Sequence, residues 1–209
     1  MTLPSPPLLV ITDRLQARGD ILEIAELAFR SGCRWLSLRE KGLPPEQQHA
    51  LLAALVARGE RHRATVTLHG DPQLARDARA QGVHLPAGSD DAAARGLLGR
   101  AALIGLSVHG AEEARAIDAN TVDYVIAGPV FETASKPGYG PALFPQGLAA
   151  IVKACTVPVI AIGGINPQNI ADCRSAGASG IAVMGAVMRA ENPAKVVTQI
   201  LGALAAQPY

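Results

Sequence analysis

The chain has 209 residues, of which 49% are hydrophobic and 18% are charged, and its formal net charge is +1. This length supports one sizeable core, so we expect a single domain over residues 1–209. The near-neutral charge and scattered Lys and Arg residues exclude a basic nucleic-acid-binding face. No apolar stretch is long enough to span a membrane. We therefore expect neither a nucleic-acid partner nor a membrane partner.

The N-terminal residues lack the basic segment and the long apolar run of a signal peptide. Cys33, Cys155 and Cys173 are odd in number and widely spaced. This pattern predicts reduced packing residues in a cytoplasmic protein. The five histidines lack zinc-ligand spacing, so we expect no zinc site.

Short apolar runs with the length and β-branched content of buried strands recur along the chain. They are Leu8–Ile11, Trp35–Leu38, Thr65–Leu68, Gly82–Leu85, Leu103–Leu106, Val122–Ile126, Val157–Ile162 and Gly180–Met184. Segments with helical spacing lie between most of them, among them Asp20–Arg30, Pro45–Arg58, Pro72–Ala80, Ser89–Gly99, Ala111–Ala119, Pro167–Ala176 and Pro193–Leu204. Asn166 and Asn192 each precede a proline, which predicts helix caps. The alternation predicts a (β/α)8 TIM barrel, with an open doubly wound sheet as the alternative.

In such a barrel the functional residues lie at the carboxyl ends of the strands. The segment Gly128–Lys136, GPVFETASK, follows the sixth strand and ends with Thr133, Ser135 and Lys136. Hydroxyl donors beside a cation suit an oxyanion such as phosphate. Arg39 and Lys41 follow the second strand. Alternation along the strand points both side chains to the same side, with Ser37 preceding them on that side. We expect them to bind an anion, the alternative being a surface salt-bridge cluster with Glu40.

Histidines lie in or at the ends of three neighbouring predicted strands. His69 ends the third strand, His84 lies in the fourth, and Ser107 and His109 end the fifth. Each histidine is either a hydrogen-bonded packing residue or an acid–base group. Glycines at the ends of strands seven and eight, Gly163, Gly164 and Gly185, would let backbone N–H groups approach a phosphate.

Six motifs in order carry a family resemblance: SLREK, GVHL, GLSVH with the following Glu112, DYVIAGPVFETASK, VIAIGGI and AGASGIAVMGAV. From about Ile11 to Pro193 the chain resembles thiamine-phosphate synthase and the TenI-type thiazole tautomerase. The resemblance implies a (β/α)8 barrel that handles a thiazole phosphate. The synthase joins the thiazole to a pyrimidine methyl pyrophosphate, and the tautomerase shifts a double bond in a thiazole carboxylate phosphate.

The resemblance also implies roles for individual residues. Arg39 and Lys41 match the synthase's pyrophosphate-binding pair, and Ser107 matches a serine near the pyrimidine and pyrophosphate. The T-x-[ST]-K signature falls on Thr133, Ser135 and Lys136. The backbone cradle for the thiazole phosphate falls on Gly164, Met184 and Gly185, beside Gly163. A homodimer is an expectation from the resemblance alone.

Three positions depart from the family patterns. The synthase's magnesium-binding carboxylates fall on Gly70 and Ser89, and one hydroxyl cannot replace two anions in a magnesium shell. Asp71, Asp90 and Asp91 are the neighbouring carboxylates. The tautomerase's proton-transfer histidine falls on Pro129, which cannot transfer a proton. We therefore expect no certain cofactor, with Mg2+ required only by a synthase.

Three hypotheses follow. The first and favoured one is a TenI-like thiazole tautomerase, in which His69 or His109 moves the proton and Lys136 assists. The second is a thiamine-phosphate synthase with a rearranged metal site using Asp71 or Asp90. The third is a non-catalytic regulator or carrier that binds thiazole phosphate or thiamine phosphate. The Pro- and Gly-rich loop over residues 137–145 is either a lid, with Tyr139 or Phe144 over the thiazole, or a surface connector.

Overall fold

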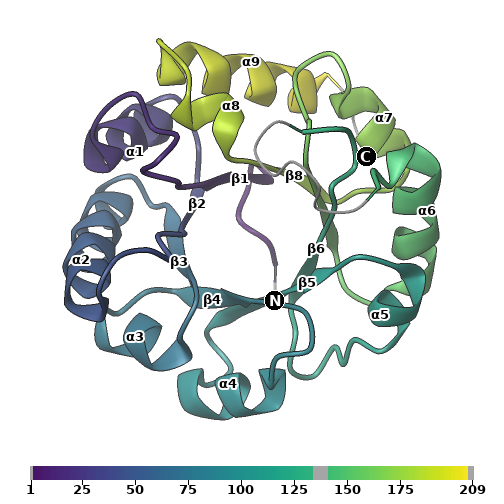
Figure 1. Cartoon of the computed structure of the whole chain (residues 1–209), viewed down its shortest axis with the longest axis horizontal. Coiled ribbons are helices and arrows are strands. Elements are labelled where there is room, and N and C mark those ends of the chain that lie inside the picture. Colours follow the sequence, from purple (N-terminus) through teal and green to yellow (C-terminus); the bar gives the residue numbers. More distant parts are fainter. Residues whose placement is uncertain (1, 134–140, 207–209) are drawn as a thin grey trace.

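The fold is a closed barrel of eight parallel strands, β1 to β8 in sequence order, ringed by helices (Figure 1). The computed structural model describes residues 2–133 and 141–206. Each strand pairs with its sequence neighbour, and β1 pairs with β8, as in the register Leu9↔Ala182. The predicted TIM barrel is confirmed, and the open-sheet alternative is wrong because the β1–β8 ladder closes the sheet.

The strands are short, as expected for a barrel that is buried on both faces. They are β1 Leu8–Ile11, β2 Trp35–Leu38, β3 Thr65–His69, β4 Gly82–Leu85, β5 Leu103–Val108, β6 Tyr124–Ala127, β7 Val159–Ile162 and β8 Gly180–Val183. The helices are α1 Ile21–Arg30, α2 Pro45–Arg61, α3 Pro72–Asp77, α4 Asp91–Leu98, α5 Ala111–Arg115, α6 Phe144–Ala154, α7 Ile170–Ser175, α8 Gly185–Met188 and α9 Pro193–Ala205.

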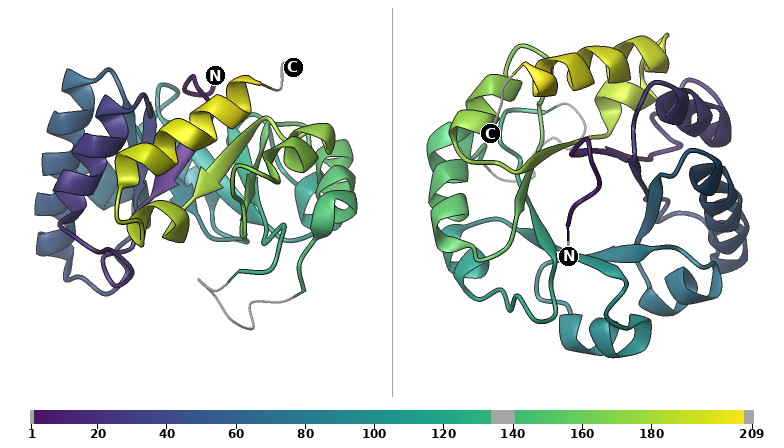
Figure 2. Two further views of the ribbon diagram at one scale, coloured as in Figure 1. Left: turned by 90° about the horizontal axis from the view of Figure 1, so that it is seen from above. Right: turned by 180° about the vertical axis from the view of Figure 1, so that it is seen from behind.

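Side chains from alternating strand positions fill the barrel interior. The largest are Trp35 and Tyr124, whose rings meet edge to face with centroids 4.8 Å apart. Gly105 faces the Tyr124 ring, and any Cβ there would overlap it. Leu3 of the N-terminal segment packs against this inner cluster. That segment lies at the end of the barrel opposite the connection that follows β6 (Figure 2). The interior is therefore a packed core.

Apolar residues on the outward strand face and the inward helix face form the second core layer. Helix caps fix where several of the surrounding helices begin. Asp20 caps α1 through Leu22 and Glu23, and Asn192 caps α9 through Lys195, as predicted for that asparagine. The cap expected from Asn166 is wrong: α7 begins at Ile170. Asn166 instead closes a turn by accepting from the backbone of Gln168.

No helix in the described ranges is both long and apolar enough to cross a membrane. Cys33 and Cys173 are buried, in agreement with the packing role expected for them, and Cys155 is half-buried. The predicted site residues Ser135 and Lys136, and Tyr139 of the proposed lid, lie outside the described residues. Phe144 begins α6, is 52% exposed and does not belong to the described lining of the cavity.

Candidate active site at the barrel mouth

A cavity of about 400 Å³ opens at the carboxyl ends of the strands. This volume lies within the usual range for small-molecule sites. The site residues predicted from the sequence that the structure describes all line it: Arg39, Lys41, His69, Ser107, His109, Thr133, Gly163, Gly164, Met184 and Gly185. The barrel thus brings residues from β2 to the start of α8 to one mouth. Their roles in binding and catalysis remain predictions.

Arg39 and Lys41 reach the cavity from the segment after β2. Within the described part of the chain, neither side chain takes part in a hydrogen bond or an ion pair. Glu40, between them, is buried and accepts from the backbone N–H of Arg14 at 3.0 Å and 3.1 Å. The salt-bridge cluster considered for Glu40 is therefore wrong, because its carboxylate holds the β1–α1 loop instead. Among the described residues, these two cations at the cavity wall have no ion-pair partner.

His69 is held by a buried hydroxyl. Ser37 Oγ lies 2.7 Å from His69 Nδ1, and the Ser37 side chain is fully buried on the adjacent strand. This contact fixes the orientation of the ring. Because His69 lines the cavity, this arrangement gives an oriented imidazole at its wall.

His84 lies next to His69 but deeper in the barrel. The two rings have centroids 4.3 Å apart, and His84 Nε2 lies 2.9 Å from Ser107 Oγ. Burial lowers the pKa of His84 to about 3, because charging the ring would cost its solvation. The imidazole is therefore neutral at neutral pH. It acts as an uncharged neighbour of His69 and a fixed hydrogen-bond partner of Ser107.

His109 stands at the rim. Its Nδ1 donates to the carbonyl of Gly128 at 3.2 Å, and its backbone N–H donates to Glu113 at 2.8 Å. A carbonyl can only accept, so Nδ1 carries a proton in this contact. Gly128 directly precedes Pro129, the position of the tautomerase's histidine. The structure therefore places a different imidazole beside that position.

The glycine pair after β7 is required by close packing. Gly163 has φ 99°, and an added Cβ would lie 2.6 Å from Pro129 Cβ. Gly164 has φ 63°, and its Cβ would lie 2.7 Å from Phe131 Cβ. Both conformations favour glycine. The Phe131 N–H donates to the Gly163 carbonyl at 3.0 Å, which seats the segment after β6 against this turn. The glycines thus position Glu132 and Thr133 at the cavity.

Several lining residues have no counterpart among those predicted. Arg189 closes α8 beside Gly185, and Glu132 precedes Thr133. Arg189 lies one helical turn after Gly185, so helical spacing could have indicated it. The apolar floor, formed by Ile11, Ile126, Ile162 and Ala182, follows from inward strand positions.

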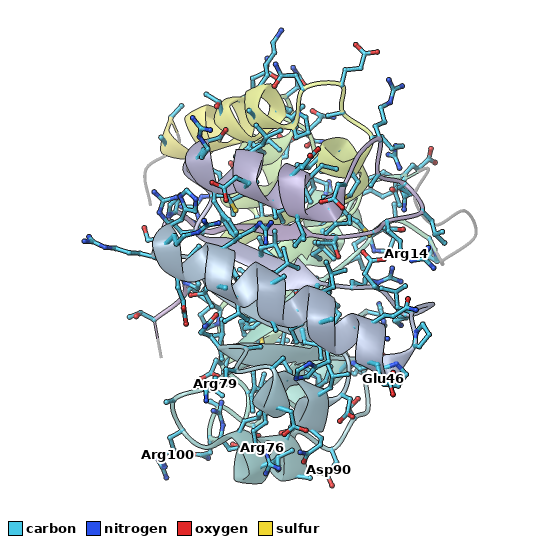
Figure 3. All side chains as sticks on the ribbon, turned by 90° about the vertical axis from the view of Figure 1, so that its left-hand side faces the viewer. Arg14, Glu46, Arg76, Arg79, Asp90 and Arg100 are labelled. Carbon is cyan, nitrogen blue, oxygen red and sulfur yellow. The ribbon has the colours of Figure 1, made fainter. Side chains whose placement is uncertain are left out.

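The magnesium that the resemblance implies does not fit the residues present. Among the described residues, no group of three or more His, Cys, Asp or Glu side chains could hold a metal ion. Asp71 caps α3 by accepting from Gln73 at 2.9 Å, and Asp90 caps α4 by accepting from Ala93 at 2.8 Å. Figure 3 shows Asp90 at the periphery, beside α4. Asp71 and Asp90, the carboxylates considered for a rearranged metal site, thus cap the N-termini of α3 and α4.

Comparison with known proteins agrees with this architecture. Residues 8–187 match the family model described as thiamine monophosphate synthase. A putative thiamine-phosphate synthase of Geobacter sulfurreducens is 39% identical over 94% of this chain and 93% of its own length. The thiamine-phosphate synthase of Chlorobium limicola is 37% identical, covering 97% of this chain and 96% of its own.

Solved structures give the same result. The thiamine phosphate pyrophosphorylase of Pyrococcus furiosus superposes with a TM-score of 0.85 at 29% identity, covering 95% of each chain. A 3-hexulose-6-phosphate synthase at 21% identity and a TM-score of 0.71 shares the fold alone. The family model and the relatives cover nearly the whole described barrel. The chain belongs to the thiamine-phosphate synthase/TenI family of thiamine-biosynthesis enzymes.

Proposed function

We propose that this chain is a thiamine-phosphate synthase, which joins a thiazole phosphate to a pyrimidine methyl pyrophosphate. The thiazole nitrogen forms a bond to the pyrimidine methylene carbon, and the carbon–oxygen bond to pyrophosphate breaks. Pyrophosphate leaves with the bonding electron pair, and no proton moves to or from carbon. Relatives at 37% and 39% identity that carry this name support the proposal over the tautomerase expected first.

The observation that carries the proposal is the pair of cations, Arg39 and Lys41, at the cavity wall. A leaving pyrophosphate gains charge as its bond to carbon breaks, so fixed cations stabilise that state more than the ground state. Arg39 can bind two phosphate oxygens through its planar guanidinium, whereas Lys41 supplies a point charge. These two residues would provide positive charge for the leaving pyrophosphate without a metal ion.

The thiazole phosphate would occupy the opposite side of the same cavity. There Gly163, Gly164 and Gly185 line the cavity, so their backbone N–H groups would bind the phosphate. Ser107, at the end of β5, and Thr133, after β6, line the same cavity. They would orient the reacting rings through hydroxyl hydrogen bonds. Close placement of the two substrates contributes much of the rate in a reaction of this kind.

Two observations favour a tautomerase as the second candidate. His69 is an oriented imidazole at the cavity wall, and Gly70 and Ser89 lack the synthase's carboxylates. In this alternative Arg39 and Lys41 would bind the thiazole carboxylate, and His69 or His109 would transfer the proton.

The test is a pair of assays on the purified chain. The synthase assay supplies both substrates and measures thiamine phosphate and pyrophosphate, and the tautomerase assay follows the thiazole carboxylate phosphate. We expect equal amounts of the two synthase products and no isomerised thiazole. Isomerisation without condensation would establish the second candidate. Ligand binding without either reaction would make the chain a thiazole phosphate carrier or regulator.

A further inference from the structure

Two buried polar residues, Thr12 and Glu40, connect the segments that follow β1 and β2. Thr12 is 1% exposed, and its Oγ1 accepts from the backbone N–H of Arg39 at 3.0 Å. The backbone N–H of Thr12 donates to the carbonyl of Ser37 at 3.0 Å. These two bonds fix the backbone at the end of β2, from which the Arg39 side chain reaches the cavity.

Glu40 makes the second connection, one residue further along. Its side chain is 3% exposed, and its carboxylate accepts from the backbone N–H of Arg14 through both oxygens, at 3.0 Å and 3.1 Å. The Glu40 carbonyl accepts from the Leu43 N–H at 3.0 Å, which closes the turn that contains Lys41. Glu40 thus ties the backbone on the N-terminal side of Lys41 to the β1–α1 loop.

The Arg14 side chain lies beside this buried charge. Arg14 Nε is 3.8 Å from Glu40 Oε2, and a Cβ built on Gly42 would lie 3.6 Å from Arg14 Nη2. Burying a carboxylate is costly, and a buried ion pair adds little stability compared with apolar side chains of similar size. We therefore expect Glu40 to contribute to the geometry of this turn more than to the stability of the fold.

We infer that Thr12 and Glu40 are positioning residues, which hold the backbone of Arg39 and Lys41 so that both cations meet one diphosphate. The β1–α1 loop thereby sets the affinity of the site for this anion. A diphosphate carries two groups of oxygens, so its binding by two cations depends on how these cations are placed relative to each other. The inference rests on the proposed function for the identity of the anion. Neither Thr12 nor Glu40 belongs to the described lining of the cavity, so both would act through the cations.

The experiment measures Kd by calorimetry for inorganic pyrophosphate and, separately, for hydroxyethylthiazole phosphate. Thr12→Val removes the acceptor with little change of shape, and Thr12→Ser keeps it. Glu40→Met removes both carboxylate oxygens, and Glu40→Gln keeps one acceptor. Thermal unfolding checks that each variant is folded.

Two matched controls remove similar groups elsewhere in the barrel. Thr67→Val is the control for Thr12, because Thr67 is fully buried and its hydroxyl donates to the Leu36 carbonyl at 3.5 Å. Asp123→Asn is the control for Glu40, because the Asp123 carboxylate accepts from the Ile104 N–H at 2.8 Å and pairs with Arg95 at 2.6 Å. Neither Thr67 nor Asp123 is among the described residues that line the cavity.

We expect Thr12→Val to weaken pyrophosphate binding about threefold to tenfold, the range of one ordinary hydrogen bond, and to leave thiazole phosphate binding unchanged. Thr12→Ser should restore the wild-type Kd. Glu40→Met should show a larger loss than Glu40→Gln, since glutamine can still accept from the Arg14 N–H. Both controls should bind pyrophosphate as wild type does, even where they unfold at a lower temperature.

A double-mutant cycle tests whether Thr12 acts through Arg39. In the Arg39→Gln background, Thr12→Val should have little further effect on the Kd for pyrophosphate, because the group that Thr12 positions is gone. An undiminished effect in that background would overturn the inference. An equal loss for pyrophosphate and thiazole phosphate, a wild-type Kd for pyrophosphate in both Thr12→Val and Glu40→Met, or no pyrophosphate binding by wild type would overturn it as well.

Failure of the proposed function looks different. In that case the wild type would bind pyrophosphate, and the variants would weaken this binding in the expected order. No thiamine phosphate would form from the two synthase substrates.

Discussion

Ser37 and His69 lie on neighbouring strands, with Ser37 Oγ 2.7 Å from His69 Nδ1, and His69 directly precedes Gly70, where the synthase pattern has a magnesium-binding carboxylate. This pair distinguishes the two candidate reactions. Condensation moves no proton to or from carbon, whereas tautomerisation requires an acid–base group. We therefore expect His69→Asn to retain condensation within a few-fold of wild type. Isomerisation of the thiazole carboxylate phosphate by wild type that falls a hundredfold in His69→Asn, as typical for removal of a general base, would instead support proton transfer by His69.

The cation pair makes a separate prediction. Arg39→Gln and Lys41→Gln should each lower kcat for condensation by roughly a hundredfold, as for loss of one stabilising group at a developing anion. Arg100→Gln is the control, since Arg100 lies on the outer surface away from the mouth (Figure 3). Steady-state kinetics with varied pyrimidine pyrophosphate would measure the effect. Unchanged kcat in both variants would remove the assigned role.

His84 predicts how stability depends on pH. Its pKa is lowered by burial from 6.5 to about 3, so the unfolded chain takes up a proton below pH 6.5 while the folded chain does not. The free energy of unfolding should be highest above pH 6.5 and fall as the pH decreases toward 3. Urea unfolding at several pH values would show this slope.

His84→Gln should reduce that slope, even though it also lowers the overall stability. His49→Gln is the control, because His49 is exposed on α2 and should leave the slope as in wild type. An identical slope in wild type and His84→Gln would contradict the account of His84 as a buried neutral imidazole.

The cysteines should differ in reactivity. Burial raises the pKa of Cys33 and of Cys173 to about 11, and both thiols are fully buried. Cys155 is only half-buried, and burial raises the pKa of its thiol as well. A thiol reagent at neutral pH should modify Cys155 first in the native protein and the other two only after unfolding. Cys155→Ser should remove the native reaction, and rapid modification of Cys33 in the folded chain would refute this order.

The strand pattern predicted the fold well because apolar runs of four to six residues mark strands that are buried on both faces. Leu8–Ile11 and Gly82–Leu85 have the predicted bounds. Helix ends were harder to predict. Ala111–Ala119 was expected, but α5 ends at Arg115, since a short helix is defined by packing more than by its own composition.

The site was predictable where it follows strand ends, because a closed parallel barrel brings those ends together. The hydrogen-bond partners of the site's side chains could not be predicted. Glu40 was expected beside Arg39 and Lys41, but it bonds to a backbone 26 residues away, and local spacing contains no information on such a contact. Helical spacing from Gly185 could have indicated Arg189, but not its partner Gln16, which lies 173 residues away in the sequence.

The most direct test is formation of thiamine phosphate by the purified chain from thiazole phosphate and pyrimidine methyl pyrophosphate, followed by mass spectrometry with magnesium and with a chelator. We expect thiamine phosphate and pyrophosphate in equal amounts. Thiamine phosphate should still form in the presence of the chelator. The described residues supply positive charge through Arg39 and Lys41 and provide no carboxylate cluster that could hold a metal ion. The absence of thiamine phosphate under both conditions, with thiazole phosphate still bound, would contradict the proposed synthase reaction. Formation of thiamine phosphate only with magnesium would contradict the prediction that the site works without a metal ion.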